Sequence, residues 1–284
     1  MVRPTTLKVS VVIPCYNEES SIALCLQALQ SQTIKPFEVI VVDNNCTDNT
    51  VKIAKEYGAT VIKEDHQGIV WARNAGFNAA SGSILAKLDA DSLPAADWVE
   101  RMQKIFINQE IQAATGTGYF YDAPCKLIVR TYRNLFAVWL NRLVLGHHML
   151  WGSNMTLRAG AWRAIGSECC QMRDIMEDLD VAAHINTHYG NRAIVYRPKM
   201  RVDISSRRAM VSLKRNWLYL SMWPRTLSIH GYQKRIILWP AIAILLTTMA
   251  LSNKVGRFYN AEEGRMVFSF NQWRSNPFYT RDNP

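Results

Sequence analysis

The sequence predicts an α/β fold, with a mainly parallel sheet and flanking helices, followed by a helical, basic C-terminal extension. Short apolar runs alternate with segments of helical periodicity over residues 9–88. Such alternation implies right-handed crossovers between parallel strands. Charge is divided unevenly, because residues 1–100 carry 8 Lys and Arg against 12 Asp and Glu, whereas residues 101–284 carry 25 against 11. We therefore expect a basic second part whose surface can face nucleic acid, anionic lipid or phosphorylated substrates.

Four strands and three helices are expected in the first part. Each strand is an aliphatic or β-branched run, as expected for a strand covered on both faces, and Pro14 ends the first of them. The helices have apolar residues at helical spacing and begin or end near residues that favour helix caps. In chain order the elements are the strand Val9–Ile13, a helix containing Ile22 and Leu29, the strand Phe37–Val42, a helix from Thr47 or Asp48 to Gly58, the strand Ala59–Lys63, the helix Gly68–Ala80 and the strand Ile84–Leu88.

The second part of the chain has weaker signals. Cys125–Leu150 has a helical pattern with interleaved Arg, which fits either an amphipathic helix with a solvated basic face or a membrane-surface helix. Trp151–Asn154 is predicted as a loop, and the acidic cluster Asp174–Asp180 precedes a further helix. Val195–Val202 is predicted as an edge strand or loop, because Pro198 interrupts it.

We divide the chain into an α/β domain over residues 1–208 and a helical, basic and apolar region over residues 209–284. Residues 236–251 carry no charge, but they include a proline, and a membrane-spanning helix needs about 20 apolar residues. Basic flanks and Trp239 suit a helix on or partly in a membrane surface. A buried core helix and a short membrane span remain the alternatives for this run.

The composition is that of a globular chain, with 49% hydrophobic and 20% charged residues. The six cysteines contain no C-x-x-C pair, and the adjacent Cys169 and Cys170 suit neither a zinc site nor an ordinary disulfide. We expect reduced cysteines in a cytoplasmic protein. No signal peptide is recognised ahead of the first strand.

Two carboxylates follow the fourth predicted strand, in Asp89-Ala90-Asp91. At the end of a strand both can reach a divalent cation such as Mg²⁺ or Mn²⁺, which prefers oxygen ligands. The same pattern also fits a plain polar loop. Because ligands of such sheets bind beyond the carboxyl ends of the strands, we expect this segment to meet Tyr16–Glu18 and Asp43. Neither G-x-G-x-x-G after the first strand nor a P-loop is present.

Four segments together resemble one family. Val11–Glu18, Val41–Asp43, Asp89–Asp91 and Glu177-Asp178 occur in the order and spacing of family 2 glycosyltransferases with the GT-A fold. The resemblance covers roughly residues 8–210. It implies a Rossmann-like domain that transfers a sugar, with inversion, from a nucleotide-sugar donor and with Mg²⁺ or Mn²⁺. A UDP-sugar is the favoured donor, and a GDP-sugar is the alternative.

The resemblance also implies a donor site. Tyr16 matches the residue that packs on the nucleobase, Asp43 matches the one that hydrogen-bonds the base, and Pro14, Asn17 and Glu18 line the same loop. The chain departs from the family pattern after Asp43, where Asn residues replace a second acidic residue that many members have. How the nucleotide is held at that point is left open.

The donor's phosphates are expected to meet the metal and basic groups. The resemblance implies that Asp91 binds the metal directly and that Asp89, with Ala90 beside it, lies near the ribose and metal. Arg73 matches a basic residue that faces the nucleotide. Arg207 and Arg208 could clamp the pyrophosphate or form a solvated or lipid-facing pair, since guanidinium groups suit phosphate oxygens.

The acidic pair Glu177-Asp178 has two interpretations from the residues alone. Acidic residues in the first turn of a helix favour the helix dipole. The resemblance implies instead that Asp178 is the catalytic base, with Glu177 beside it. A carboxylate within hydrogen-bond reach of an acceptor hydroxyl can take its proton as the new bond forms.

Further candidates surround this pair. Trp151, Gly152 and Ser153 could shape an acceptor pocket by stacking on a sugar, and a packing role for the Trp is the alternative. Three histidines are possible third metal ligands or simply structural residues: His184, His188 and His230. Arg158 is a weaker candidate near the acceptor.

The overall expectation is an enzyme at the inner face of a membrane. Its acceptor would be a hydroxyl or phosphate of a glycan or lipid-linked sugar, in polysaccharide, lipopolysaccharide or glycolipid synthesis, or a polyprenyl phosphate. The rival classes are a basic nucleic-acid-binding protein and a non-catalytic nucleotide-binding protein. No nucleic-acid motif accompanies the basic residues, which are mixed with apolar runs, so we expect no nucleic-acid partner.

Overall fold

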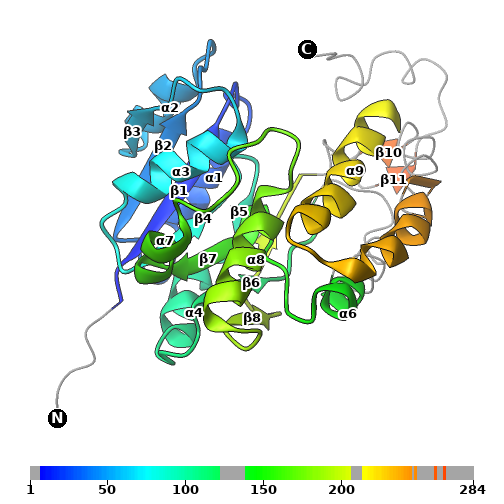
Figure 1. The fold of residues 1–284 in the computed structure, drawn as a ribbon. Coiled ribbons are helices and arrows are strands. Elements are labelled where there is room, and N and C mark those ends of the chain that lie inside the picture. Colours follow the sequence, from blue (N-terminus) through cyan, green and yellow to red (C-terminus); the bar gives the residue numbers. More distant parts are fainter. Residues whose placement is uncertain are drawn as a thin grey trace.

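The computed structural model describes residues 7–121, 138–205, 213–244, 246–247, 259–260 and 265–266. Within these residues a seven-stranded sheet lies between two layers of helices (Figure 1). The strand order is β3-β2-β1-β4-β7-β6-β8. The predicted mainly parallel sheet with flanking helices is confirmed.

Parallel pairing holds the four predicted strands together at the centre and one edge of the sheet. Only β7 runs antiparallel to its two neighbours in the sheet, β4 and β6. It was not predicted, because four residues with two polar side chains give no clear period. The strands of the sheet are β1 Val9–Cys15, β2 Glu38–Asp43, β3 Thr60–Lys63, β4 Ile84–Lys87, β6 Ala113–Gly116, β7 Met155–Arg158 and β8 Ile194–Arg197.

Alternate side chains of β1 enter the two halves of the core. Val11 and Ile13 pack in a cluster with α1, α2 and α4, whereas Val12 packs with α3, α7 and α8. This alternation follows from the two-residue period of a strand. The helices of the two layers are α1 Ile22–Gln30, α2 Thr50–Glu56, α3 Ile69–Ala79, α4 Trp98–Ile105, α7 Ala159–Ile165 and α8 Glu177–Tyr189.

One glycine allows α3 to approach the sheet closely. A Cβ atom on Gly76 would lie 2.2 Å from Cγ1 of Val12 and 3.0 Å from Cγ2 of Val42. Real Cβ atoms do not tolerate the shorter of these separations, so the helix could not pack here with a larger residue. This contact places the buried Arg73, one helical turn earlier, over the carboxyl half of the sheet.

The prediction of helix as far as Leu150 is wrong. The helix α6 spans Asn141–Leu145 and ends at Gly146, whose φ of 78° is left-handed and favours glycine. Residues 125–137 of the predicted helical segment lie outside the described residues. The predicted loop at Trp151–Asn154 contains a single helical turn, η2 Gly152–Asn154.

The segment Val195–Val202, predicted as an edge strand or loop, contains both: β8 pairs only with β6 in the seven-stranded sheet and ends just before Pro198, and residues 198–201 are not part of a strand. Because β8 runs in the same direction as β4, the chain after this proline is at the sheet's carboxyl end. There β9 Val202–Asp203 pairs with β5 Leu93–Pro94, which directly follows the Asp89–Asp91 segment.

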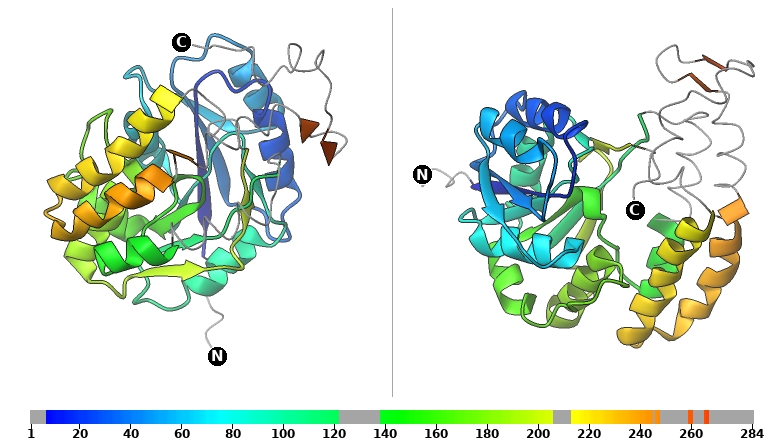
Figure 2. Two further views of the ribbon diagram at one scale, coloured as in Figure 1. Left: turned by 90° about the vertical axis from the view of Figure 1, so that its right-hand side faces the viewer. Right: turned by 90° about the horizontal axis from the view of Figure 1, so that it is seen from above.

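The C-terminal helices pack beside α8 (Figure 2). They comprise α9 Leu213–Ile229, the turn η3 Gln233–Ile237 and helical residues 238–244. Leu179 of α8 joins Leu220 and Leu227 of α9 and Leu238 in one apolar cluster. Two short strands, β10 Tyr259–Asn260 and β11 Arg265–Met266, pair farther along the chain.

Residues 236–251, the run with three interpretations, have one buried and one exposed side where they are described, and their association with a membrane surface stays a prediction. Leu238 and Ile242 are buried in the apolar cluster, whereas Ile236 and Trp239 are exposed. In the part of the chain that the structure describes, we find no helix with the length and apolarity that a membrane crossing requires.

Candidate active site

The loop after β1 presents an exposed aromatic side chain. Tyr16 is 51% exposed, and the next residue, Asn17, has a φ of 55° that turns the chain sharply. The side-chain oxygen of Asn17 accepts a hydrogen bond of 2.8 Å from the backbone N–H of Thr47. This bond ties the β1 loop to the loop after β2.

The same two loops bring the predicted base-binding residues together. Cys15 is paired with Asp43 in the β1–β2 register, so Tyr16 leaves the sheet beside the end of β2. Oδ1 of Asp43 accepts a hydrogen bond of 2.8 Å from the N–H of Cys46. Glu18 accepts a hydrogen bond from the hydroxyl of Ser21, which fixes the start of α1. The structure therefore brings five predicted residues together at the carboxyl end of strands β1 and β2: Pro14, Tyr16, Asn17, Glu18 and Asp43.

The Asp89-Ala90-Asp91 segment lies next to these loops, because β4 is the other neighbour of β1. The N–H of Leu88 donates to the carbonyl oxygen of Val12, and the chain then leaves the sheet. Burial and the nearby charges of Asp91, Asp89 and, more weakly, Glu18 raise the pKa of the Cys25 thiol in α1. The two carboxylates and the β1 loop therefore surround the same thiol.

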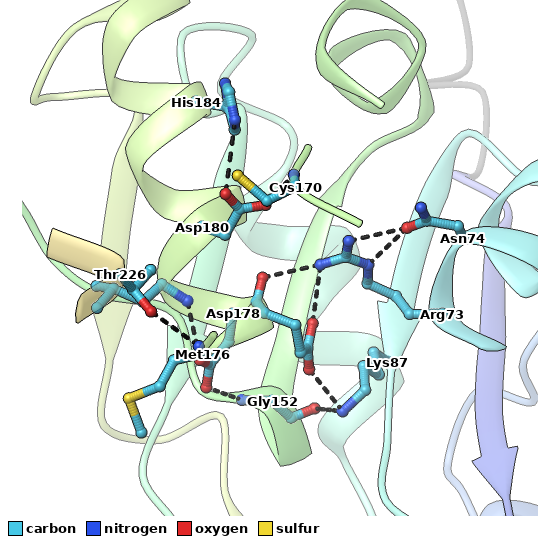
Figure 3. A network of polar contacts seen from close by, with 12 residues as sticks. Arg73, Asn74, Lys87, Gly152, Cys170, Met176, Asp178, Asp180, His184 and Thr226 are labelled. Atoms are coloured by element: carbon cyan, nitrogen blue, oxygen red, sulfur yellow. Dashed lines mark hydrogen bonds and ion pairs between the residues drawn. The ribbon is translucent and has the colours of Figure 1, made fainter. Parts of the chain in front are cut away.

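A buried network of charges joins β4 to the first turn of α8 (Figure 3). The ammonium of Lys87 lies 2.9 Å from Oδ1 of Asp89 and 3.1 Å from Oε1 of Glu177. It also donates to the carbonyl oxygen of Gly152 at 2.9 Å. Burial by itself would lower the pKa of Lys87, and the charges of Asp89 and Glu177 raise it above its ordinary value. Lys87 therefore stays charged inside the protein.

Glu177 also holds a second buried cation. Its Oε2 and its backbone oxygen both accept hydrogen bonds from Nη1 of Arg73, at 2.9 and 2.8 Å. The Arg73 side chain is fully buried, and its guanidinium lies 5.4 Å from the ring of Trp162. Arg73 is therefore buried against Glu177, and the nucleotide-facing role that the resemblance implied stays a prediction.

Asp178 lies beside this network and is partly exposed. Its Oδ2 accepts a hydrogen bond of 2.8 Å from the N–H of Gly152, whose carbonyl oxygen binds Lys87. A single residue, Gly152, thus connects Asp178 to the Lys87–Asp89 pair through its N–H and its carbonyl oxygen. Burial and the charge of Glu177 raise the pKa of Asp178 to about 7, against the hydrogen bond from Gly152. A carboxylate with a pKa near neutrality can accept a hydroxyl proton efficiently.

The position of Gly152 shows how closely these groups converge. A Cβ atom on Gly152 would lie 3.1 Å from Oε1 of Glu177, 3.2 Å from Nζ of Lys87 and 3.5 Å from Oδ2 of Asp178. Trp151 and Ser153, predicted near the acceptor, flank this glycine and are partly exposed. Arg207 and Arg208 lie outside the described residues.

The carboxylates of Asp89 and Asp91 fit a hard divalent cation, since both supply only oxygen ligands. The Asp89 side chain is 18% exposed, and Asp91 is 7% exposed. The Lys87 ammonium occupies one oxygen of Asp89 and fixes the orientation of that carboxylate. Asp91 and the second oxygen of Asp89 would therefore be the ligands from this segment.

Lys87 was missed as a site residue, although a signal was present. A lone Lys in an apolar strand, two residues before Asp89, must point to the same side of the strand as that carboxylate. The histidines and Arg158 have other partners. His184 and His230 lie beside Asp180, and His188 contacts Glu168 at 2.9 Å. Arg158 donates to the carbonyl oxygens of residues 106, 108 and 111.

A sequence model described as glycosyl transferase family 2 matches residues 10–173, which is more than half of the chain. The chain belongs to glycosyl transferase family 2. The match ends just before Glu177 and Asp178. Glu177 contacts the matched region through its ion pairs with Arg73 and Lys87.

Curated relatives of this family 2 chain match part of its length. Glycosyltransferase AglE of Haloferax volcanii is 44% identical over 101 residues, which are 33% of this chain and 33% of AglE. Glycosyltransferase GlyA of Streptococcus pneumoniae is 31% identical over 120 residues, which are 40% of this chain and 17% of GlyA. The matches thus span a third or less of each relative's length.

Solved structures with low sequence identity share the fold. The mannosyltransferase PcManGT from Pyrobaculum calidifontis, in complex with GDP-Man and Mn²⁺, aligns with a TM-score of 0.61 at 19% identity over 88% of this chain and 74% of its own. Glucosyl-3-phosphoglycerate synthase from Mycobacterium tuberculosis aligns with a TM-score of 0.57 at 17% identity over 79% and 81% of the two chains. These alignments confirm the GT-A fold.

Proposed function

We propose that this family 2 chain is a metal-dependent, inverting glycosyltransferase that uses a nucleotide-diphosphate sugar. The observation that carries the proposal is the convergence of two groups of carboxylates. Asp89 and Asp178 approach from β4 and α8 and are linked through Lys87 and Gly152. A donor held by the first group would lie beside a base from the second.

The chain's own groups account for the steps of the reaction. Asp178 accepts the proton of the acceptor hydroxyl as that oxygen bonds to the anomeric carbon and the carbon–diphosphate bond breaks. Asp89 and Asp91 would hold a cation, Mg²⁺ or Mn²⁺, and such a cation would supply stabilisation of the negative charge that develops on the diphosphate. The buried cations Lys87 and Arg73 orient Asp89 and Glu177.

The proposed donor is a UDP-sugar, with a GDP-sugar as the alternative. Both nucleotides occur in complexes of the structural neighbours: PcManGT was solved with GDP-Man, and the synthase from Mycobacterium tuberculosis with UDP-glucose. In this chain Tyr16 and Asp43 are the proposed contacts of the base. The exposed ring of Tyr16 suits stacking, and the partly exposed carboxylate of Asp43 suits hydrogen bonding, to either nucleobase.

A thermal-shift panel of nucleoside diphosphates, with and without Mn²⁺, tests this function. The matching nucleotide at a hundredfold excess over its Kd should stabilise the protein by about 2.7 kcal/mol, and Mn²⁺ should be required. The Asp91→Asn variant should lose this Mn²⁺-dependent response, because one charged metal ligand becomes neutral.

Asp97→Asn is the matched control, since Asp97 is partly exposed and pairs with Arg101 in α4. It should respond like the natural protein. If no nucleotide stabilises the protein with Mn²⁺, the enzyme assignment is refuted. Salt-sensitive binding of DNA without any nucleotide response would favour the nucleic-acid class instead.

We propose further that the acceptor is presented at an anionic membrane surface, with the protein peripheral to its inner, cytoplasmic face. The C-terminal helices support this, because Trp217 and Trp239 are 46% and 43% exposed with ring centroids 6.0 Å apart. Trp217 is on α9, and Lys214 and Arg215 are exposed at the start of that helix. Paired interfacial aromatic rings with neighbouring basic groups suit a lipid-facing surface and a lipid-linked acceptor.

Vesicle sedimentation tests the membrane proposal. The protein should partition onto phosphatidylglycerol vesicles more strongly than onto phosphatidylcholine vesicles, because Lys and Arg near the surface favour anionic lipid. The double variant Trp217→Ser, Trp239→Ser should reduce partitioning about tenfold or more, since it removes two apolar side chains from the contact. Ile107→Ser, at a 70% exposed site after α4, is the control and should bind normally. Equal binding by both variants would contradict this surface.

A further inference from the structure

A cluster of four side chains with metal-binding chemistry meets at α8, on the side of the helix away from Asp178. One ligand atom from each of Cys170, Asp180, His184 and His230 lies within 4.8 Å of the others. Asp180 is fully buried, and the side chains of His184 and His230 are 15% and 12% exposed. From these residues we propose a structural zinc site.

The cluster is distinct from the proposed donor site. Asp178 and Asp180 are two residues apart on α8, and each residue rotates about 100° around a helix, so their side chains point in nearly opposite directions. Asp178 is bonded to Gly152, whereas Asp180 faces Cys170 and His184 (Figure 3). A cation bound by Asp180 would therefore lie on the opposite side of α8 from Asp178.

The distances suit closure around one small cation. Oδ1 of Asp180 lies 2.9 Å from Nε2 of His230 and 3.6 Å from Nε2 of His184. Zinc binds nitrogen, oxygen and sulfur at about 2.0–2.3 Å in a tetrahedron, so its ligand atoms are separated by about 3.3–3.8 Å. Ligand atoms that span no more than 4.8 Å need to move by only about 1 Å or less to reach this geometry.

Two features of His184 indicate that these four side chains bind a metal and do not simply hydrogen-bond to one another. Its Nε2 is buried and has no hydrogen-bond partner, because the carboxylate of Asp180 is too distant at 3.6 Å. Its other nitrogen, Nδ1, lies 3.5 Å from Oε2 of Glu168. Ligating histidines commonly face a carboxylate through the ring nitrogen that does not bind the metal. Glu168 is in position for that role.

The type of ligand selects the metal. A thiol and two imidazoles favour zinc, whereas Mg²⁺ and Mn²⁺ prefer oxygen ligands such as those of Asp89 and Asp91. Four protein ligands leave no open position, which is typical of a structural site. The adjacency of Cys169 and Cys170 did not suggest zinc, because the other ligands lie on α8 and just after α9 and form no motif with these cysteines in the sequence.

The site would fasten three separate segments. Cys170 belongs to the chain between α7 and α8, Asp180 and His184 belong to α8, and His230 follows the end of α9. His230 lies beyond the residues matched by the family model. The metal would therefore hold the C-terminal helices against the helix that carries Asp178.

Metal analysis and cobalt substitution of the full chain test this proposal. The purified protein should contain one zinc per chain in addition to any Mg²⁺ or Mn²⁺ that it requires. Co²⁺ in place of zinc should give the intense visible absorption of a tetrahedral site and a thiolate-to-cobalt charge-transfer band. Substituting a residue that only hydrogen-bonds to a metal ligand weakens metal binding 10–100-fold, so replacing a ligand itself, by Cys170→Ser or His184→Gln, should weaken it at least about 100-fold.

The chain offers a matched control for each variant. Cys169→Ser changes the neighbouring cysteine, and His188→Gln changes the next histidine on α8, which contacts Glu168. Both should keep one cobalt with the charge-transfer band, as should Asp91→Asn. A folded natural protein that binds no zinc or cobalt, or one whose cobalt spectrum lacks the thiolate band, would overturn the proposal. This readout on the natural protein holds even if a ligand variant fails to fold.

Discussion

Replacing Asp178 with Asn is expected to lower the rate of sugar transfer by about 10²–10⁴-fold, because the variant lacks the group that accepts the acceptor's proton. Binding of the nucleotide donor with Mn²⁺ should remain near normal, since Asp89 and Asp91 are unchanged. The loss should therefore appear in kcat, with little change in the donor's Kd. Initial rates and donor titration by calorimetry measure the two quantities.

The amide keeps the shape of the side chain, but it can accept only one of the two hydrogen bonds that Gly152 and Leu179 donate to the carboxylate. The control must therefore show that folding is intact. Asp174→Asn neutralises another carboxylate of the same acidic segment, one that pairs with Arg225 and is half exposed. It should transfer sugar at the normal rate. Near-normal turnover by Asp178→Asn would exclude Asp178 as the base.

Replacing Glu177 with Gln is expected to destabilise the protein by about 3–5 kcal/mol. Glu177 lies between two cations, and the side chains of Arg73 and Lys87 are 0% and 2% exposed. Removing the negative charge leaves both cations buried beside a neutral amide. Lys87 keeps Asp89 and the carbonyl oxygen of Gly152, and Arg73 keeps the backbone oxygen of Glu177, so we expect the lower end of this range. Urea titration measures the change in the free energy of unfolding.

A double-mutant cycle separates the interaction between Glu177 and Lys87 from any independent loss of stability that each substitution causes. Adding Lys87→Met to Glu177→Gln removes one of the stranded cations, so the double variant should be less destabilised than the sum of the single variants by about 0.5–3 kcal/mol. Glu100→Gln is the control, because Glu100 pairs with an exposed Lys104 on α4. An exposed pair of this kind contributes at most about 1 kcal/mol. Additive single variants, or a loss below 1 kcal/mol for Glu177→Gln, would contradict the proposed network.

The first half of the fold and the donor-side residues could be predicted from local sequence patterns. Strands such as β1 and β4 are buried on both faces, so their own composition marks them. The residues that follow each strand then meet at the carboxyl end of the sheet, because parallel strands all end on that side. Tyr16, Asp43 and Asp89 are close together for this reason, and no knowledge of side-chain packing was needed to expect it.

The second half of the sheet was harder to predict. β6 and β7 have four residues each, and they become strands through pairing with neighbours that are distant in the sequence. The short helices α4 and α7 were missed as well. Their stability comes from buried residues such as Trp98 and Trp162, whose surroundings are assembled only when the sheet forms.

The sequence by itself determined the family, the parallel core and the positions of the carboxylates, because these depend on the order and period of nearby residues. Only the tertiary structure decided which charges are partners. Arg73 and Glu177 are 104 positions apart, and Asp180 and His230 are 50 apart. Such contacts arise when separate segments bury charged or polar side chains together, since a group removed from water must find its partner in the folded protein. This physical requirement gave Arg73 a buried role and placed His184 and His230 around Asp180.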